Sequence, residues 1–166
     1  MSSSDTPIRG RRALLLGLAA LPLAGCNFQP VYGPGGSGAL IRDRIRILDP
    51  ETRIEFELVS RLEDRIGRGA DYELSYELDT AQRDVAIDGA DNIDRINLVG
   101  ELGFTLRETG SGRIVQNGAV ATFTAYATTA SPVATASARR DAEDRLAVAL
   151  ADQLVSRLIA GAPGWT

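Results

Sequence analysis

Residues 1–25 have the layout of a segment that is removed before the rest of the chain folds, and the cysteine at which it is cut follows them. Three arginines precede an apolar run at 13–21, which is too short to form a membrane-spanning helix. The run leads into Leu-Ala-Gly-Cys at 23–26, and small residues directly before a cysteine give a signal peptidase room to cut. This layout predicts a bacterial lipoprotein signal peptide over 1–25 and a lipidation site at Cys26, rather than a buried free cysteine.

Cleavage before Cys26 would leave 141 of the 166 residues, tethered by acyl chains. Each buried methylene contributes about 0.8 kcal/mol, so several chains together hold a protein on a membrane almost permanently. The glycine-rich stretch within 26–39 predicts a flexible tether, followed by one globular domain over 40–161 and a tail over 162–166. Asn27 stands where an aspartate often signals inner-membrane retention. We therefore expect the periplasmic side of the outer membrane, reached by either general or twin-arginine export.

The composition removes most catalytic chemistries from the mature domain. The chain has no histidine and no lysine, and Cys26 is its only cysteine. Imidazole catalysis, lysine Schiff bases, thiolate attack, His/Cys metal sites and an internal disulfide are therefore excluded. Removal of 1–25 takes away three of 18 arginines and one of 22 acidic residues, which leaves a net charge of −6. We expect no enzyme, no catalytic residue, no cofactor beyond the acyl chains on Cys26, and no nucleic-acid partner.

The remaining acidic residues give little support to a metal or carboxylate site. Asp88, Asp91 and Asp94 lie in one loop, but the glycine and distal glutamate of an EF-hand are missing, so we expect a solvated loop and no metal. The acidic residues at 63–64 and 141–144 fit better as solvent-facing partners of nearby arginines than as catalytic pairs.

Hydrophobic periodicity divides the first half of the domain into a strand, a helix and a second strand. Alternation over 41–48 predicts a strand, and Pro50 suits the first turn of a helix. The helix has an apolar stripe that ends at a pair of glycines: Ile54, Leu58, Val59, Leu62 and Ile66, then Gly67 and Gly69. A half-buried strand follows over 72–79. Because the alternation changes parity at Val85, we expect a bulge or bend between Asp79 and Asp84.

The second half predicts a long hairpin and a closing helix. One strand has a common apolar face: Ile96, Leu98, Leu102, Phe104 and Leu106. The turn at 108–112 leads into a strand over 113–128, and Ser137 is a candidate cap for the last helix. The predicted fold class is α+β: a two-layer sandwich with two helices on one face of a small mixed sheet. The opposite face is expected to be mostly polar.

The segment after the lipidation site resembles the mature N-terminus of a known family. Residues 26–33 are Cys-Asn-Phe-Gln-Pro-Val-Tyr-Gly, similar to the Cys-Gly-Phe-x-Pro-Leu-Tyr-Gly string of alphaproteobacterial LptE-type lipopolysaccharide-assembly lipoproteins. Asn27 and Val31 depart from that string. The order of elements over the mature chain and the helix segment 140–154 also resemble this family.

The resemblance implies a non-enzymatic role. Such proteins plug a large outer-membrane β-barrel, LptD, help that barrel to assemble, and help it to insert lipopolysaccharide into the outer leaflet. The chain is therefore expected to be a lipid-anchored subunit of this translocon. The alternative is a lipoprotein scaffold subunit of another envelope lipid-transport complex. Phe28, Pro30 and Tyr32 are expected to pack near the membrane, or else to form a plain extended tether, and Trp165 has no assigned role.

Arginines are the candidate contacts to lipopolysaccharide or a partner. Arg42, Arg44 and Arg46 are expected in a row on one strand, about 6.6 Å apart, where bidentate guanidinium groups could meet phosphates. The alternative, which we favour, is pairing with Glu73 and Glu77 on a neighbouring strand.

Two further pairs of arginines are candidates. Arg107 and Arg113 flank the hairpin turn, where most charged side chains are simply solvated. Arg139 and Arg140 are expected at the start of the last helix, where positive charge is mildly unfavourable, and they could bind a partner or lipid or merely reach solvent.

Overall fold

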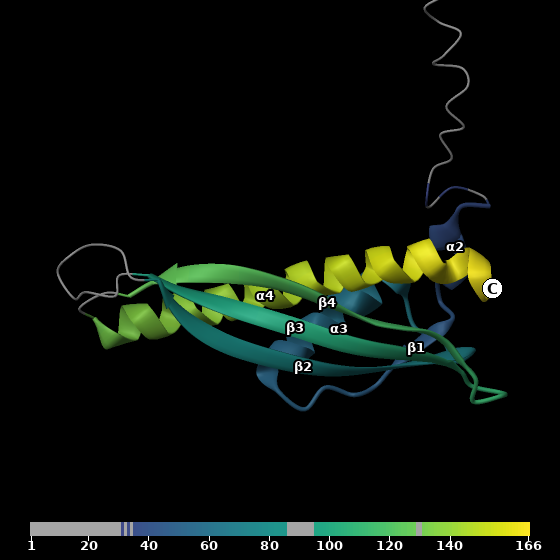
Figure 1. Ribbon diagram of the computed structural model, residues 1–166, viewed down its shortest axis with the longest axis horizontal. Helices are drawn as coiled ribbons and strands as arrows, with labels where there is room; N and C mark the ends of the chain where they lie inside the picture. Colours follow the sequence, from purple (N-terminus) through teal and green to yellow (C-terminus); the bar gives the residue numbers. More distant parts are fainter. Residues whose placement is uncertain (1–30, 32, 34, 86–94, 129–130) are drawn as a thin grey trace, which may run out of the picture. The chain divides into compact units, whose positions relative to one another are not determined.

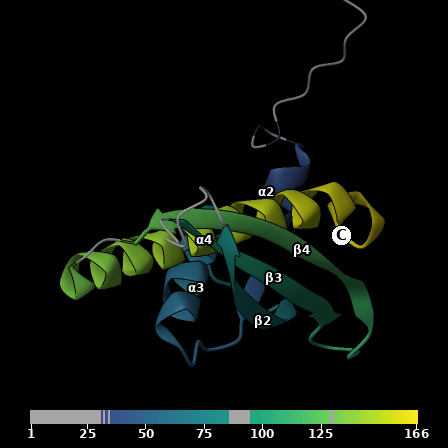
Figure 2. The same cartoon turned by 60° about the vertical axis from the view of Figure 1, so that its left-hand side comes forward.

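A computed structural model describes residues 31, 33, 35–85, 95–128 and 131–166. Within them, four strands form one sheet in the order β1-β2-β3-β4, with β1 parallel to β2 and the other neighbours antiparallel. The elements in chain order are α2 (Ser37–Ile41), β1 (Ile45–Ile47), α3 (Arg53–Ile66), β2 (Tyr72–Val85), β3 (Arg95–Glu108), β4 (Ile114–Ala127), α4 (Pro132–Gly161) and the 3-10 turn η1 (Ala162–Gly164). Helices α3 and α4 lie on the same face of the sheet (Figures 1 and 2), which confirms the predicted two-layer α+β class.

The segment before β1 differs from the prediction. A strand was expected from Ile41, but Ile41 ends helix α2 and is buried, and β1 begins only at Ile45. Asp43 has a positive φ of 56°, which interrupts extended backbone between the two isoleucines. Its N–H donates to the carbonyl of Ile66 at 2.7 Å, so this corner is fastened to the end of α3. The helix also takes up Ser37 and Gly38, which belong to the stretch expected to be a flexible tether.

Helix α3 begins and ends at residues with clear local causes. Thr52 is the N-cap: its side chain accepts from the N–H of Glu55, and the Glu55 carboxylate accepts from the N–H of Thr52 at 3.1 Å. This capping box starts the helix at Arg53, so the expectation that Pro50 occupies its first turn was wrong. The helix ends at Gly67, as predicted, where a φ of 73° suits glycine.

The two central strands pair without interruption over their whole length. Residues Tyr72 to Val85 of β2 face Glu108 back to Arg95 of β3 in one continuous register, so of the bulge or bend expected between Asp79 and Asp84 the bulge is contradicted. A register shift occurs instead between β3 and β4, at Leu106 and Arg107, beside the hairpin turn. The predicted apolar face of β3 is confirmed, because its even-numbered residues face the helices. The acidic loop with Asp88, Asp91 and Asp94 lies outside the described residues.

Helix α4 is longer than predicted. Its N-cap is Ser131, whose side chain accepts from the N–H of Ala134, rather than Ser137, and it runs 30 residues from Pro132. By length and composition, the segment 132–164 is the one candidate membrane span found in the described part of the chain. In the apolar 18-residue stretch of this segment, 44% of the residues are buried inside the domain. The core helix of a soluble protein can have the same length and composition.

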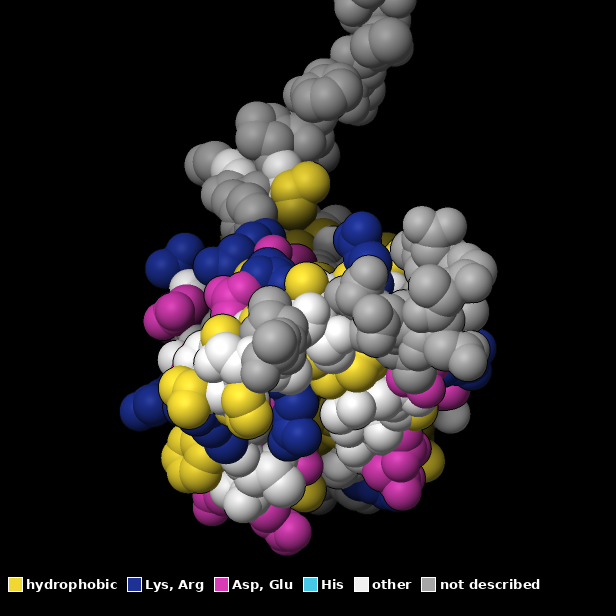
Figure 3. Space-filling model, turned by 90° about the vertical axis from the view of Figure 1, so that its left-hand side faces the viewer, with side chains coloured by type: hydrophobic (Ala, Val, Ile, Leu, Met, Phe, Trp, Pro, Cys, Tyr) yellow, Lys and Arg dark blue, Asp and Glu magenta, His cyan; other side chains and the backbone are white. Residues whose placement is uncertain are grey.

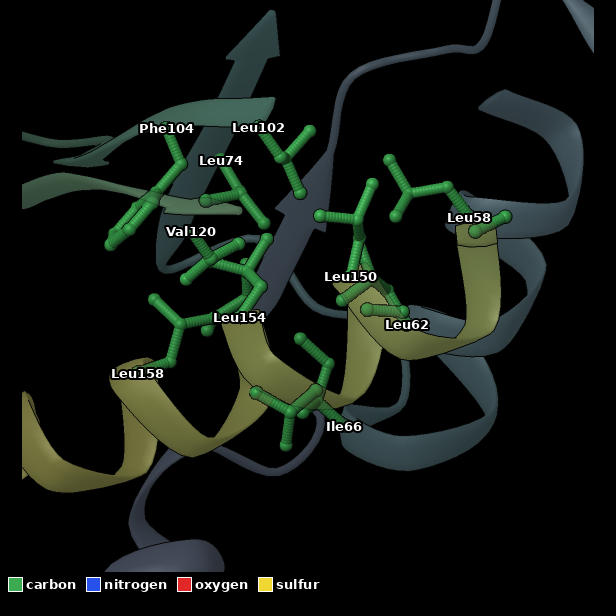
Figure 4. Packing of buried hydrophobic residues seen from close by; sticks show 14 of the residues in the cluster. Leu58, Leu62, Ile66, Leu74, Leu102, Phe104, Val120, Leu150, Leu154 and Leu158 are labelled. Atoms are coloured by element: carbon green, nitrogen blue, oxygen red, sulfur yellow. The ribbon is translucent and has the colours of Figure 1, made fainter. Parts of the chain in front are cut away.

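The core lies between the sheet and the two long helices (Figure 4). Leucines from α4 meet the apolar faces of β2 and β3 on one side and the stripe of α3 on the other. The largest fully buried side chains are Ile41, Ile45, Leu58, Leu62, Ile66, Leu74, Leu102, Leu106, Leu146, Leu150, Leu154 and Leu158. The predicted stripe of α3 is therefore confirmed as a face that builds the core, and the buried face of α4 builds the rest.

Candidate functional site

Two of the candidate arginines bind acidic residues at the start of the neighbouring strand β2, one just before it and one on it. Arg44 donates from Nε to Asp71 Oδ2 at 2.8 Å and from Nη1 to the Leu40 carbonyl at 3.2 Å. The hydrogen bond to Asp71 raises the pKa of Arg44, and the guanidinium lies 5.2 Å from the ring centre of Tyr72. Arg46 pairs with Glu73, its register partner on β2. The pairing that the sequence favoured is thus found for Arg46, while Glu77 takes no part in it.

A short row of charges crosses the outer face of the sheet at this end. Glu73 faces Arg46 on one side and Arg107 on the other in the strand register. Arg107 is exposed and forms no ion pair with a described residue. One carboxylate is therefore flanked by two guanidinium groups, so the row has an excess of positive charge that β1, β2 and β3 hold in a fixed order.

Arg42 and Arg113 lie near the same end of the domain. Arg42 follows helix α2 and lies 3.8 Å from Asp43, so it is not on β1 and the expected row of three arginines on one strand does not form. Arg113 lies 3.6 Å from Glu108 at the hairpin. Both are more than half exposed, which makes these pairs weak. An open hollow of about 590 Å³ lies between the hairpin turn and the start of β2, lined in part by Arg44.

Arg139 and Arg140 lie at the other end of the domain, on α4 (Figure 1). Because the helix begins at Pro132, they belong to its third turn, and the expected unfavourable position at a helix N-terminus was wrong. Arg139 pairs with Glu143 at 2.9 Å, whereas Arg140 has no ion pair with a described residue. The end view in Figure 3 shows arginine and acidic side chains mixed over this surface.

Arg53 is a further neighbour of this second arginine group, and no sequence pattern indicated it. Its guanidinium binds Asp144 at 2.7 Å and Glu143 at 3.4 Å, so Glu143 is shared between Arg53 and Arg139. The contact joins α3 to α4 across about 90 positions of sequence. No local pattern could have revealed it, because it depends on how the two helices lie against each other.

Trp165, which had no assigned role, packs the C-terminus against the start of β2 and of β4. Its indole Nε1 donates to Gln116 Oε1 at 2.9 Å, and its carbonyl accepts from the Tyr72 hydroxyl at 3.1 Å. The two rings meet edge to face with centroids 4.8 Å apart. Gln116 also donates to the Arg157 carbonyl at 2.8 Å, so the tail, β4 and α4 are joined in one network.

The side chain of Tyr76 is the one described group with a strongly perturbed pKa. Burial, assisted by the negative charges of Glu55, Asp49 and Glu51, raises the pKa of Tyr76 to about 12. The hydroxyl is buried and makes no hydrogen bond with a described residue. This perturbation follows from burial of the ring and from the nearby carboxylates, because no described residue hydrogen-bonds to the hydroxyl.

No group of three or more metal-ligating side chains that could hold an ion occurs among the described residues. Cys26, Phe28, Pro30 and Tyr32 lie outside the described residues, so lipidation and membrane-proximal packing stay predictions. The outer sheet face is polar along β2 and β3, as predicted, but β4 adds alanines and Phe123, whose exposed fraction is 64%.

The described domain is a mixed sheet backed by two helices, and in the sequence it follows the segment predicted to carry the lipidation signal. A family model described as "LptE: Lipopolysaccharide-assembly" matches residues 43–158, from β1 to the last turns of α4. The chain therefore belongs to the LptE lipopolysaccharide-assembly family, as its N-terminal string predicted, and this is a family of non-catalytic lipoproteins.

Solved structures show the same fold in other bacterial lipoproteins. A putative lipoprotein from Caulobacter crescentus has a TM-score of 0.64 at 22% identity and covers 78% of this chain and 97% of its own. Rare lipoprotein B from Shewanella oneidensis has a TM-score of 0.54 at 12% identity, covering 70% and 92%. An uncharacterized lipoprotein B from Nitrosomonas europaea has a TM-score of 0.52 at 12% identity, covering 72% and 83%. No curated protein matches the chain by sequence.

Proposed function

We propose that this chain is a lipid-anchored, non-catalytic subunit of an outer-membrane lipopolysaccharide translocon. It assists a large LptD-like β-barrel to assemble and to insert lipopolysaccharide. The observation that carries the proposal is the family match over 43–158, which spans the strands and the two long helices of the domain. The lipidation signal ending at Cys26 and the absence of histidine and lysine from the chain agree with a structural rather than a catalytic task.

The anchor and its location form the first part of the proposal. Acyl chains on Cys26 hold the domain on the periplasmic side of the outer membrane, and Asn27 favours that sorting. Cys26→Ser removes the acylation site. We expect the variant to keep its signal peptide or to leave the membrane fraction. Recovery of the parent chain, with Cys26 intact, in inner-membrane fractions would contradict outer-membrane sorting.

Lipopolysaccharide phosphates are the proposed ligands of the arginines near the start of the sheet. Arg46 and Arg107 flank Glu73, and because Arg46 already pairs with that carboxylate, the Arg107 guanidinium is left to grip phosphate bidentately. Arg113 adds a further exposed charge at the adjacent hairpin. Arg46, Glu73 and Arg107 come from three neighbouring strands, which keeps the spacing of these charges fixed while a ligand binds.

The partner is tested by purifying the acylated chain from detergent-extracted membranes and identifying by mass spectrometry what stays bound. We expect a large β-barrel in stoichiometric amount, with lipopolysaccharide carried along. A monomer without partners would contradict the translocon role. Co-purification with an inner-membrane transporter would favour a scaffold role in another envelope lipid-transport complex.

The lipopolysaccharide contact is tested in the same preparation with Arg107→Gln combined with Arg113→Gln. We expect less lipopolysaccharide per barrel, and a weaker dependence of retention on salt, because two phosphate-directed charges are lost. Arg83→Gln is the matched control, since Arg83 is exposed on β2 and has no ion pair with a described residue. The double variant removes two charges and the control removes one, so a loss in the control of about half that in the double variant would show that the arginines act only through net charge.

A further inference from the structure

The two edges of the sheet differ sharply in how they are protected. The edge formed by β1 is three residues long and carries the Arg46–Glu73 ion pair. The edge formed by β4 is 14 residues long, Ile114–Ala127, and contains neither a charged residue nor a proline. Within the described sheet β4 pairs only with β3. Long uncharged edges invite pairing with another strand, and proteins ordinarily shorten, charge or cover them. The edge of β4 therefore requires an explanation.

Helix α4 provides a second wall beside this edge. An open groove of about 590 Å³ is lined by Ala119, Val120 and Ala121 of β4 and by Asp152, Gln153, Ser156 and Arg157 of α4. Figure 1 shows α4 running beside β4 along much of its length. A strand added to β4 would lie against the side of α4 and bury the groove, while the small alanine side chains leave room for larger residues opposite them.

One contact shows which backbone groups of β4 point toward the free edge. Arg145 of α4 donates to the Ala125 carbonyl at 3.1 Å. In an antiparallel strand the N–H and C=O of one residue point to the same side, and alternate residues share that side. The backbone groups of Ala119, Ala121 and Phe123 therefore face outward with those of Ala125, and Ala119 and Ala121 also line the groove.

We propose that the edge of β4 binds an extended segment of a partner protein, which adds a fifth strand to the sheet and carries acidic side chains toward Arg157. Arg157 is exposed and has no ion pair with a described residue. The nearby Asp152 does not neutralise it, because Asp152 is held by Arg61 at 3.1 Å and Arg65 at 3.2 Å. The charge next to the groove thus favours an acidic strand. This inference does not depend on the lipopolysaccharide role.

A second copy of the chain fits this edge less well. Antiparallel pairing of two β4 strands centred on Ala121 would set Ala125 of one copy opposite Asn117 of the other. Arg145 reaches Ala125 of its own copy. The Arg157 carbonyl accepts a hydrogen bond from Gln116, next to Asn117. Arg145 of one copy would therefore approach Arg157 of the other. Like charges brought together in this way oppose self-pairing.

The test uses the full chain in detergent micelles and a synthetic peptide of roughly nine residues, the length of an ordinary strand. The peptide alternates valine and threonine and has a glutamate near each end; a second peptide has arginines at those positions. Affinity is measured by fluorescence anisotropy and the bound site by hydrogen exchange. We expect the glutamate peptide to bind more tightly, and the outward amides of β4 to become protected.

Two variants distinguish strand pairing at the β4 edge from non-specific peptide binding. Ala121→Pro removes one outward N–H without removing a bond to β3, and we expect it to weaken peptide binding about fivefold or more. Arg157→Glu is expected to reverse the preference between the two peptides, and the matched Arg83→Glu is expected to leave it unchanged. If Ala121→Pro fails to fold by circular dichroism, the reversal by Arg157→Glu still decides the question.

Absence of peptide binding, binding without protection of β4 amides, or equal affinity for both peptides would overturn the proposal. A concentration-dependent dimer in which β4 amides are protected would overturn it in favour of a second copy. Because no lipopolysaccharide or barrel is present, failure here leaves the translocon proposal standing, and failure of the membrane pull-down leaves this one standing.

Discussion

The close approach of helix α4 to the sheet predicts opposite effects for one substitution at two glycines of β3. A Cβ on Gly100 would lie 3.0 Å from Leu146 Cδ2 and 3.0 Å from Leu150 Cδ1, whereas a Cβ on Gly103 would meet nothing closer than the Glu77 carbonyl at 4.0 Å. Carbon atoms pack comfortably at about 3.5–4.0 Å, so both leucines would have to move at position 100.

The magnitudes follow from these distances. Overpacking of a filled core costs about 1–3 kcal/mol, and replacing glycine by alanine in a strand returns roughly 0.5–1 kcal/mol through backbone entropy. We expect Gly100→Ala to lower the free energy of unfolding by about 1–2 kcal/mol, and Gly103→Ala to leave it unchanged or raise it by about 0.5 kcal/mol. Urea unfolding of the full chain in micelles, followed by circular dichroism and by fluorescence of the single tryptophan, measures both.

A double-mutant cycle tests the cause. Leu146→Ala removes the side chain that a Cβ at position 100 would meet, so the cost of Gly100→Ala should fall by about 1 kcal/mol in that background. Part of the cost should remain, because Leu150 is still present. Equal effects at positions 100 and 103, or strict additivity of Gly100→Ala with Leu146→Ala, would refute the packing argument.

Three further predictions concern local features. Tyr76→Phe should leave stability unchanged or raise it by up to about 1 kcal/mol, because the buried hydroxyl has no described partner. Parent stability should fall as the pH rises from about 10, where an unfolded tyrosine ionises, toward about 12, and Tyr76→Phe should lack this part of the loss in pH-dependent melts. Trp165→Ala should cost about 2 kcal/mol through the lost contacts to Tyr72 and Gln116, and Trp165→Phe about half of that, by urea unfolding; equal costs would discount the indole hydrogen bond. Thr52→Ala should cost about 1 kcal/mol by loss of the α3 cap, and Thr52→Ser almost nothing.

Hydrophobic periodicity was a sound guide wherever one long element packs one face against the core. The stripes of α3 and α4 and the apolar face of β3 all follow it, because a period of 3.6 or 2 places the same residues inward along the whole element. The hairpin turn was predictable for a local reason as well. Gly112 has a φ of 70° and supports the change of direction between β3 and β4.

Prediction failed where a helix or strand is short, and where a contact joins residues that are far apart in the sequence. The spacing from Ile41 to Ile45 fits a strand on paper, yet Asp43 turns the backbone between them and Ile41 reaches the core from a helix. The start of α4 was placed six residues late, because its first turns extend past the core and are exposed, so they carry no apolar stripe. Ser131 did carry one local start signal that Ser137 lacks, because Pro132 follows it at the first helical position.

The availability of the arginines is decided by strand register, which spacing along the chain does not reveal. Arg44 and Arg46 are engaged by acidic residues 27 positions away, because β1 lies parallel to β2. Arg107, on the other side of β2, faces the same Glu73 that already pairs with Arg46. A second cation next to an occupied carboxylate gains little from it, so Arg107 keeps most of its capacity to bind an anion. The sheet thus converts three similar arginines into two that stabilise its edge and one that remains open to a phosphate.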